Sequence, residues 1–161
     1  MRKRMLGSLF AIGLLCLAGS SISYAAENPA EQQLTLYERL GGEAGIMAVV
    51  DEFVALGAAN PKVNFTRKGT DKEWPATPEN VDKLKEHLIQ FISVATGATD
   101  VIYEGRDMLT VHEGMKISNA EFDALALDLK AALGKFNVPD EEQNELLNIV
   151  GSIRGQIVEE T

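Results

Sequence analysis

Apolar side chains recur at helical spacing in four separate stretches of this chain, and no stretch shows the alternation expected of a strand. The clearest stretch begins at Thr77-Pro78, a pair typical of an N-cap and a first helical residue, and ends at Gly97. Its apolar stripe consists of Val81, Leu84, Leu88, Phe91, Ile92 and Ala95. The pattern predicts an all-α fold of five or six helices joined by short connections.

The other stretches carry boundary signals of their own. A short helix is expected at about 34–40, ended by Gly41-Gly42, a pair that stops a helix and lets two segments approach closely. A second helix is expected at about 43–58, and Ser118-x-x-Glu121 is a capping box that opens a later one. The last helix begins near Pro139-Asp140. The stripes of these three are Ile46, Val49, Val50 and Phe53; then Phe122, Leu125, Leu129, Leu133 and Phe136; then Leu146, Ile149, Val150, Ile153 and Ile157.

An irregular stretch from 62 to 76 separates the second and third predicted helices. It contains Phe65, Gly69, Trp74 and Pro75. This is long for a loop in a small domain, so the segment is expected to be either disordered or shaped around something.

The first 25 residues resemble a secretory signal peptide. Arg2, Lys3 and Arg4 precede a mostly apolar run, and Ser23 and Ala25 are the small residues that a signal peptidase prefers before its cut. The expected organisation is a signal peptide at 1–25, a polar extension at 26–33 and one domain at 34–161. The expected location of the exported protein is the bacterial periplasm.

Charge and cysteine content exclude several classes of function for the exported product. Without the signal peptide, 12 Lys and Arg face 24 Asp and Glu, a formal net charge of −12, which argues against nucleic acid and anionic membranes as partners. The only cysteine, Cys16, lies in the signal, so disulfides, thiolate metal sites and covalent haem attachment through cysteine are excluded. A lipoprotein with acylated Cys16 is disfavoured because Leu15 is bulky where a small residue is expected.

Two histidines, His87 and His112, are the whole supply of imidazole. His87 lies on the apolar stripe of its helix, where a border histidine with one nitrogen in water is the simpler interpretation. His112 lies in a short apolar segment before a capped helix, a place that does not otherwise require histidine. Zinc-ligand spacing, a nucleophile elbow and a phosphate-binding glycine loop are absent from the sequence.

From 36 to about 158 the sequence resembles the truncated haemoglobins of group I. The resemblance rests on Leu36-Tyr37-Glu38-Arg39-Leu40-Gly41-Gly42, Val49-Val50-Asp51-Glu52-Phe53, Tyr103-Glu104-Gly105-Arg106-Asp107-Met108, Glu121-Phe122-Asp123-Ala124 and Val138-Pro139, in that order. It implies a truncated globin fold, in which two pairs of helices sandwich a non-covalently held b-type haem.

The resemblance also implies roles for individual residues. It makes His112 the proximal iron ligand, with Met108, Val111, Ile117 and Phe122 lining that side of the haem. Phe65 matches the phenylalanine that packs on the haem plane. Phe53, Val54, Leu84 and Leu88 fall on the distal side, where Val54 replaces the usual tyrosine and the two leucines replace frequent glutamines.

His87 matches a position at which some relatives supply a sixth iron ligand, and the alternative is a ring that points along the haem edge toward a propionate. Trp74 could supply an indole donor, although anchoring an exposed loop is the simpler role. The expected function is reversible binding of small diatomic ligands (O2, NO, CO) or electron transfer with a reductase or other donor. Alternatives are an enzyme that removes nitric oxide or peroxide, which requires polar distal donors, and a helical module without a cofactor.

Overall fold

The computed structural model describes residues 33–159, and this part of the chain contains helices and connections but no strand. The predicted signal peptide at 1–25 lies outside the described residues, as does the polar extension at 26–33 except for Gln33. Within the described part no helix is long and apolar enough to cross a membrane. Residues 33–159 contain seven helices where five or six were expected: α1 (Leu36–Arg39), α2 (Gly42–Ala59), α3 (Pro78–Thr96), α4 (Met108–His112), α5 (Asn119–Lys135), α6 (Asp140–Ser152) and α7 (Arg154–Ile157).

The predicted helix boundaries coincide with local cap geometry. The Thr77 hydroxyl accepts a hydrogen bond from the Asn80 amide at the start of α3, and Gly97 ends that helix with φ of 105°. The Ser118 hydroxyl and the Glu121 carboxylate form the reciprocal capping box at the start of α5. These ends were predictable because each depends on neighbours within four residues.

Gly41 and Gly45 allow α1 and α2 to meet at a sharp angle. Gly41 adopts φ of 90°, a left-handed conformation that favours glycine. At Gly45 an added Cβ would lie 2.0 Å from the carbonyl oxygen of Leu40. The close approach that was expected at Gly41-Gly42 is thus found at Gly45, while Gly41 supplies the left-handed turn.

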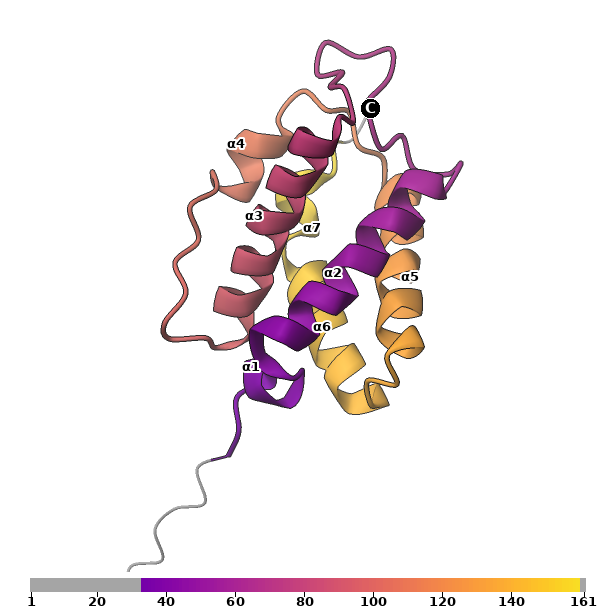
Figure 1. Ribbon diagram of the computed structural model, residues 1–161. Coiled ribbons are helices and arrows are strands. Elements are labelled where there is room, and N and C mark those ends of the chain that lie inside the picture. Colours follow the sequence, from indigo (N-terminus) through magenta and orange to yellow (C-terminus); the bar gives the residue numbers. More distant parts are fainter. Residues whose placement is uncertain (1–32, 160–161) are drawn as a thin grey trace, which may run out of the picture. The chain divides into compact units, whose positions relative to one another are not determined.

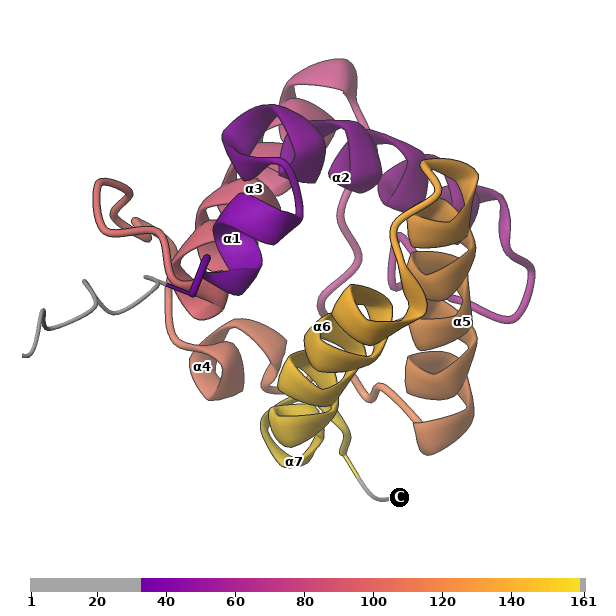
Figure 2. The ribbon, with the colours of Figure 1, turned by 90° about the horizontal axis from the view of Figure 1, so that it is seen from below.

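The helices form two crossed pairs, α2 with α3 and α5 with α6 (Figures 1 and 2). α2 packs against both α3 and α5, while the short α4 packs chiefly against α7. The expected two-over-two arrangement of an all-α fold is confirmed.

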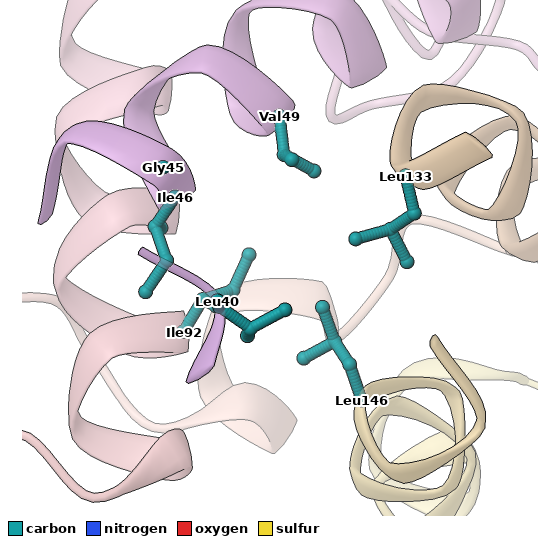
Figure 3. A pocket seen from close by; sticks show the side chains of 7 residues that line it. All are labelled: Leu40, Gly45, Ile46, Val49, Ile92, Leu133 and Leu146. Carbon is teal, nitrogen blue, oxygen red and sulfur yellow. The ribbon is translucent and has the colours of Figure 1, made fainter. Parts of the chain in front are cut away.

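A filled part of the core lies where α1, the first half of α2, the later turns of α3, α5 and α6 converge. Val50, Leu133 and Leu146 are at most 1% exposed there. Figure 3 shows Leu146 and Leu133 pointing toward one another, and the cavity between these side chains measures only about 10 Å³. A space of that size holds at most one water molecule, so this end of the domain is filled.

Two details of the last helices differ from expectation. The predicted final helix divides at Ile153 into α6 and α7, because the Ser152 hydroxyl donates to the Ile149 carbonyl and competes with regular helical bonding. Phe136 was expected on the buried stripe of α5, but it is the C-cap residue and is 44% exposed. Helical spacing does not hold beyond the last turn, so the stripe ends at Leu133.

Candidate functional site

His112 occupies the last position of α4, a helix of five residues. The Asp107 carboxylate starts this helix by accepting a hydrogen bond from the Thr110 amide at 2.9 Å. The resulting turn brings the Nδ1 of His112 to 2.8 Å from the carbonyl oxygen of Met108. Because a carbonyl can only accept, Nδ1 carries the proton and the lone pair is on Nε2.

Burial favours the neutral form of the His112 ring. Loss of solvent around the ring lowers the pKa of His112 below its ordinary value of 6.5, although the hydrogen bond to Met108 acts in the opposite direction. A neutral imidazole with Nδ1 fixed by a backbone carbonyl and Nε2 unprotonated is the form that ligates a metal ion. The donor chemistry of His112 therefore fits a haem iron.

The apolar residues around His112 are half-buried. Met108, Val111 and Ile117 keep partial exposure, and none of them belongs to the packed core cluster. α4 and α7 contain no fully buried residue. The apolar side chains of Met108, Val111 and Ile117 thus keep part of their surface exposed.

The first three turns of α3 behave in the same way. Leu84, His87 and Leu88 are half-buried, and the fully buried residues of this helix begin only at Ile92. On α2, Phe53 is half-buried and Val54 is 4% exposed within the core. The residues predicted for the two faces of a haem thus come from α2 and α3 for one face and mainly from α4 and the start of α5 for the other.

The His87 ring lies edge-on to the Tyr103 ring, with 6.4 Å between centroids. Tyr103 also packs edge-on against Phe91 at 5.7 Å, and its hydroxyl donates to the Arg106 carbonyl at 2.8 Å. Burial raises the pKa of Tyr103 above its ordinary value of 10.0. Within residues 33–159, the His87 ring takes part in no hydrogen bond. Its aromatic contact is with the Tyr103 ring.

The irregular stretch between α2 and α3 is an ordered series of turns. The Trp74 indole donates to the Phe65 carbonyl at 3.0 Å, and the two rings pack with centroids 5.5 Å apart. This is the loop-anchoring role expected of Trp74, and the indole donor is used within the loop itself. Phe65 also packs against the core cluster.

Phe122 has a neighbour that the sequence did not indicate. It is 6% exposed, and the Arg154 guanidinium lies 4.3 Å from the centre of its ring. Asp123 and Asn119 in turn accept hydrogen bonds from Arg154. Phe122 therefore links the start of α5 to α7 through Arg154. It also follows His112 closely in the sequence.

Sequence reasoning missed Arg67 and Glu159. Arg67, in the loop before α3, is 7% exposed and pairs with Glu121 at 2.8 Å across 54 positions of sequence. Glu159, near the C-terminus, binds the segment that follows His112. Neither residue has a local signature, because both act through partners distant in sequence.

Comparison with known proteins decides the family. Residues 35–159 match the family model described as bacterial-like globin. The chain belongs to this globin family. It is 30% identical over 120 residues to the group 1 truncated hemoglobin of Tetrahymena pyriformis, covering 74% of this chain and 91% of that protein. It is also 30% identical to group 1 truncated hemoglobin GlbN of Synechocystis, covering 73% and 90%.

Solved structures agree with the fold of this globin. It resembles the truncated hemoglobin of Tetrahymena pyriformis in the Fe(III) form, with a TM-score of 0.67, 28% identity, and 79% of this chain and 100% of that chain covered. It also resembles the 2/2 hemoglobin of Synechococcus in the cyanomet state with covalently attached heme, at TM-score 0.62 and 31% identity over 76% and 95%. The predicted likeness to group I truncated haemoglobins is therefore confirmed.

Proposed function

We propose that this globin binds haem b non-covalently and that Nε2 of His112 is the proximal iron ligand. The observation that carries the proposal is the 2.8 Å contact between Nδ1 of His112 and the Met108 carbonyl in a half-buried, neutral ring. A proximal histidine is the usual protein ligand of haem iron in globins. Family membership supports the choice of haem over any other metal group.

Apolar residues, most of them half-buried and two of them (Val54 and Phe122) buried, would provide the two walls of the haem site. On the proximal side these are Met108, Val111, Ile117 and Phe122. On the distal side they are Phe53, Val54, Leu84 and Leu88, and Phe65 would pack on the haem plane. Their role is to exclude water and to bury the faces of the porphyrin, which also stabilises the folded chain through linkage.

The proposed activity is reversible binding of a small diatomic gas, or electron transfer with a reductase or other donor. Haem, when bound, supplies an iron centre that takes such a ligand and changes oxidation state. Val54, Leu84 and Leu88 contribute no hydrogen-bond donor to a ligand on the distal side. Stabilising charge on a reacting ligand requires such donors, so this distal wall favours binding or electron transfer over nitric oxide or peroxide removal.

His87 has two proposed roles. It ligates the iron as a sixth ligand, or it remains along α3 beside Tyr103 and points toward a haem propionate. Its position between Leu84 and Leu88 supports the first role. Apolar side chains cannot hydrogen-bond a water molecule on the iron, so water would compete only weakly with the imidazole for the sixth position. Its edge-on contact with Tyr103 at 6.4 Å supports the second.

The proximal assignment is tested by haem titration of the wild type, His112→Ala and His87→Ala. Loss of the iron ligand in His112→Ala is expected to abolish stable haem retention, while His87→Ala retains haem and serves as the matched control. Added imidazole is expected to restore a haem spectrum to His112→Ala by filling the vacated position. An unchanged spectrum and unchanged haem retention in His112→Ala would contradict the assignment.

The two roles of His87 are separated by ferrous spectra and carbon monoxide binding in the wild type and His87→Leu. Ligation predicts a six-coordinate low-spin wild type that becomes five-coordinate in the variant. If His87 is detached from the iron in only about 1% of wild-type molecules, carbon monoxide affinity rises about 100-fold when the histidine is removed. Identical spectra and binding rates would leave His87 as an edge residue.

We also propose that the protein is exported to the periplasm after cleavage near Ala25. The basic residues 2–4, the apolar run and the small residues before Ala26 support this location. Intact mass of the product from its native host is expected to show a chain that begins near Ala26. A product that retains Met1, or one that carries lipid on Cys16, would contradict the proposal.

A further inference from the structure

The connection from Glu113 to Ser118 begins directly after His112 and has an unusual backbone. Gly114 adopts φ of 78° and Lys116 adopts φ of 53°, both in the left-handed region. A non-glycine residue such as Lys116 is disfavoured in that region unless its surroundings hold it there. The connection therefore requires restraint from other parts of the molecule.

Glu159 provides the first restraint. Its carboxylate accepts hydrogen bonds from the amides of Gly114 and Lys116, the second at 2.7 Å. Its own amide donates to the Ile117 carbonyl at 2.9 Å. A single residue near the C-terminus thus binds three backbone groups of the connection, the amides of Gly114 and Lys116 and the carbonyl of Ile117.

The loop before α3 provides the second restraint. Arg67 donates from Nη1 to Glu121 at 2.8 Å and from Nη2 to the Lys116 carbonyl at 3.3 Å. Lys72 lies against Gly114, since a Cβ added there would meet the Lys72 Cε at 3.0 Å. The long loop, expected from sequence to be either disordered or shaped around something, thus contacts this connection through Arg67 and Lys72.

Burial indicates that the Arg67 contact is fixed. Arg67 is 7% exposed, and its Nε is buried without a hydrogen-bond partner in the described part of the chain. An unsatisfied buried Nε is unfavourable, so the bonds to Glu121 and the Lys116 carbonyl must offset that cost for Arg67 to stay buried. The α4 helix, by contrast, has five residues and none fully buried.

We propose that Glu159 and Arg67 are positioning residues that hold the connection after α4 and thereby fix the His112 ring for its ligand role. This inference rests on the proposed haem function for its consequence, while the restraint itself is independent of haem. α4 packs against α7 but has no fully buried residue, so we infer that the position of His112 also depends on the segments at the ends of that helix. Residues that orient a metal ligand commonly change metal affinity by about 10- to 100-fold when removed.

The restraint is tested first without haem, by amide hydrogen exchange at Gly114 and Lys116. Glu159→Ala removes both acceptors and is expected to accelerate exchange of these two amides. The matched control is Glu52→Ala, which removes a carboxylate that pairs with Lys135 at the other end of the domain and leaves the two amides unchanged. Equal exchange at Gly114 and Lys116 in wild type and Glu159→Ala would overturn the proposed restraint.

The consequence for His112 is tested by the rate of haem loss and by the iron–histidine stretching frequency in the ferrous protein. Glu159→Ala is expected to lose haem about 10-fold faster and to shift that frequency. Glu159→Gln keeps one acceptor oxygen and is expected to restore part of both. Arg67→Lys, which keeps the charge but loses the planar fork, is expected to change both properties in the same direction as Glu159→Ala.

The outcomes separate the two proposals. A variant that melts at lower temperature but retains the wild-type frequency and rate of haem loss would show a merely structural role and overturn the positioning proposal. If the wild type itself takes up no haem, the proposed function fails, and the consequence for the iron ligand fails with it. If His112→Ala loses haem while Glu159→Ala matches wild type, only the positioning proposal fails.

Discussion

The two ends of this domain are built from similar apolar residues but differ in how completely they are buried. Where α1, α2, α5 and α6 converge, Leu133 and Leu146 are at most 1% exposed and enclose almost no free volume (Figure 3). Around the first turns of α3 and around α4, leucine, valine and methionine side chains remain half-buried. The same hydrophobic content therefore completes a core at one end and leaves it incomplete at the other.

This difference teaches how stability and function are divided along the chain. Packed interiors approach the density of crystals, so the filled end stabilises the fold through its own side-chain packing. The half-buried end has apolar surface that burial would stabilise, and it contains a neutral histidine with an available Nε2. We expect this end to gain its stability from the haem that it binds.

The largest effect that would break the comparison comes from truncating a leucine at each end of the haem-free protein. Leu133→Ala creates a cavity in the filled end and is expected to lower the free energy of unfolding by about 2–5 kcal/mol. Leu84→Ala, on the half-buried side, is expected to lower it by about 1 kcal/mol. Urea denaturation measures both, and equal losses would show that the two ends are packed alike.

The two leucine variants are expected to show the opposite order in their effect on haem binding. Leu84→Ala removes part of the proposed distal wall and should weaken haem retention more than Leu133→Ala does at a temperature where both variants are folded. Haem transfer to an excess of a haem-free acceptor globin measures the two rates. Faster loss from Leu133→Ala than from Leu84→Ala would contradict the assigned division.

A smaller effect is expected from filling space at two glycines. In Gly45→Ala the new methyl group collides with the Leu40 carbonyl, which is expected to destabilise the filled end by about 1–3 kcal/mol. The control is Gly134→Ala on α5, where no atom lies within 4 Å of the added Cβ. There the substitution is expected to be neutral or to stabilise by about 0.5–1 kcal/mol, since alanine favours the helix. A Gly45→Ala variant as stable as wild type would show that the turn between α1 and α2 can accommodate a Cβ at this position.

The smallest predicted effect is a pH dependence at the half-buried end. Burial acts to raise the pKa of Glu121, but hydrogen bonds from the Ser118 amide and Arg67 outweigh it and lower the pKa below its ordinary value of 4.5. A lowered folded-state pKa means that the stabilisation is complete above the unfolded value and is lost as pH falls through the folded value. Acid denaturation of wild type and Glu121→Gln is expected to show a shallower loss of stability in the variant. An equal loss of stability with falling pH in the two proteins would contradict this prediction.

The sequence was informative wherever the cause is local. The caps at Thr77, Gly97 and Ser118 and the turn at Gly41 were predictable, because each depends on residues within four positions. Likeness to a known family supplied His112 as a site residue, and the contact of His112 with Met108 stays within the same five-residue helix.

The rest depends on distant partners that leave no pattern. A loop arginine such as Arg67 is usually exposed, so nothing in its neighbourhood indicated burial against Glu121. Glu159 likewise lies 45 positions from Gly114, its hydrogen-bond donor. Phe136 was wrongly assigned because helical spacing continues in the sequence after the helix itself has ended.

The most direct test of the central claim is amide hydrogen exchange across the domain before and after addition of haem. The account predicts strong new protection in the first turns of α3 and in α4 with the connection to α5, and little change in α5 around Leu133 or α6 around Leu146. His112→Ala should remove most of the new protection. Protection spread evenly over both ends, or confined to the filled end, would contradict the claim that the half-buried end is the haem site.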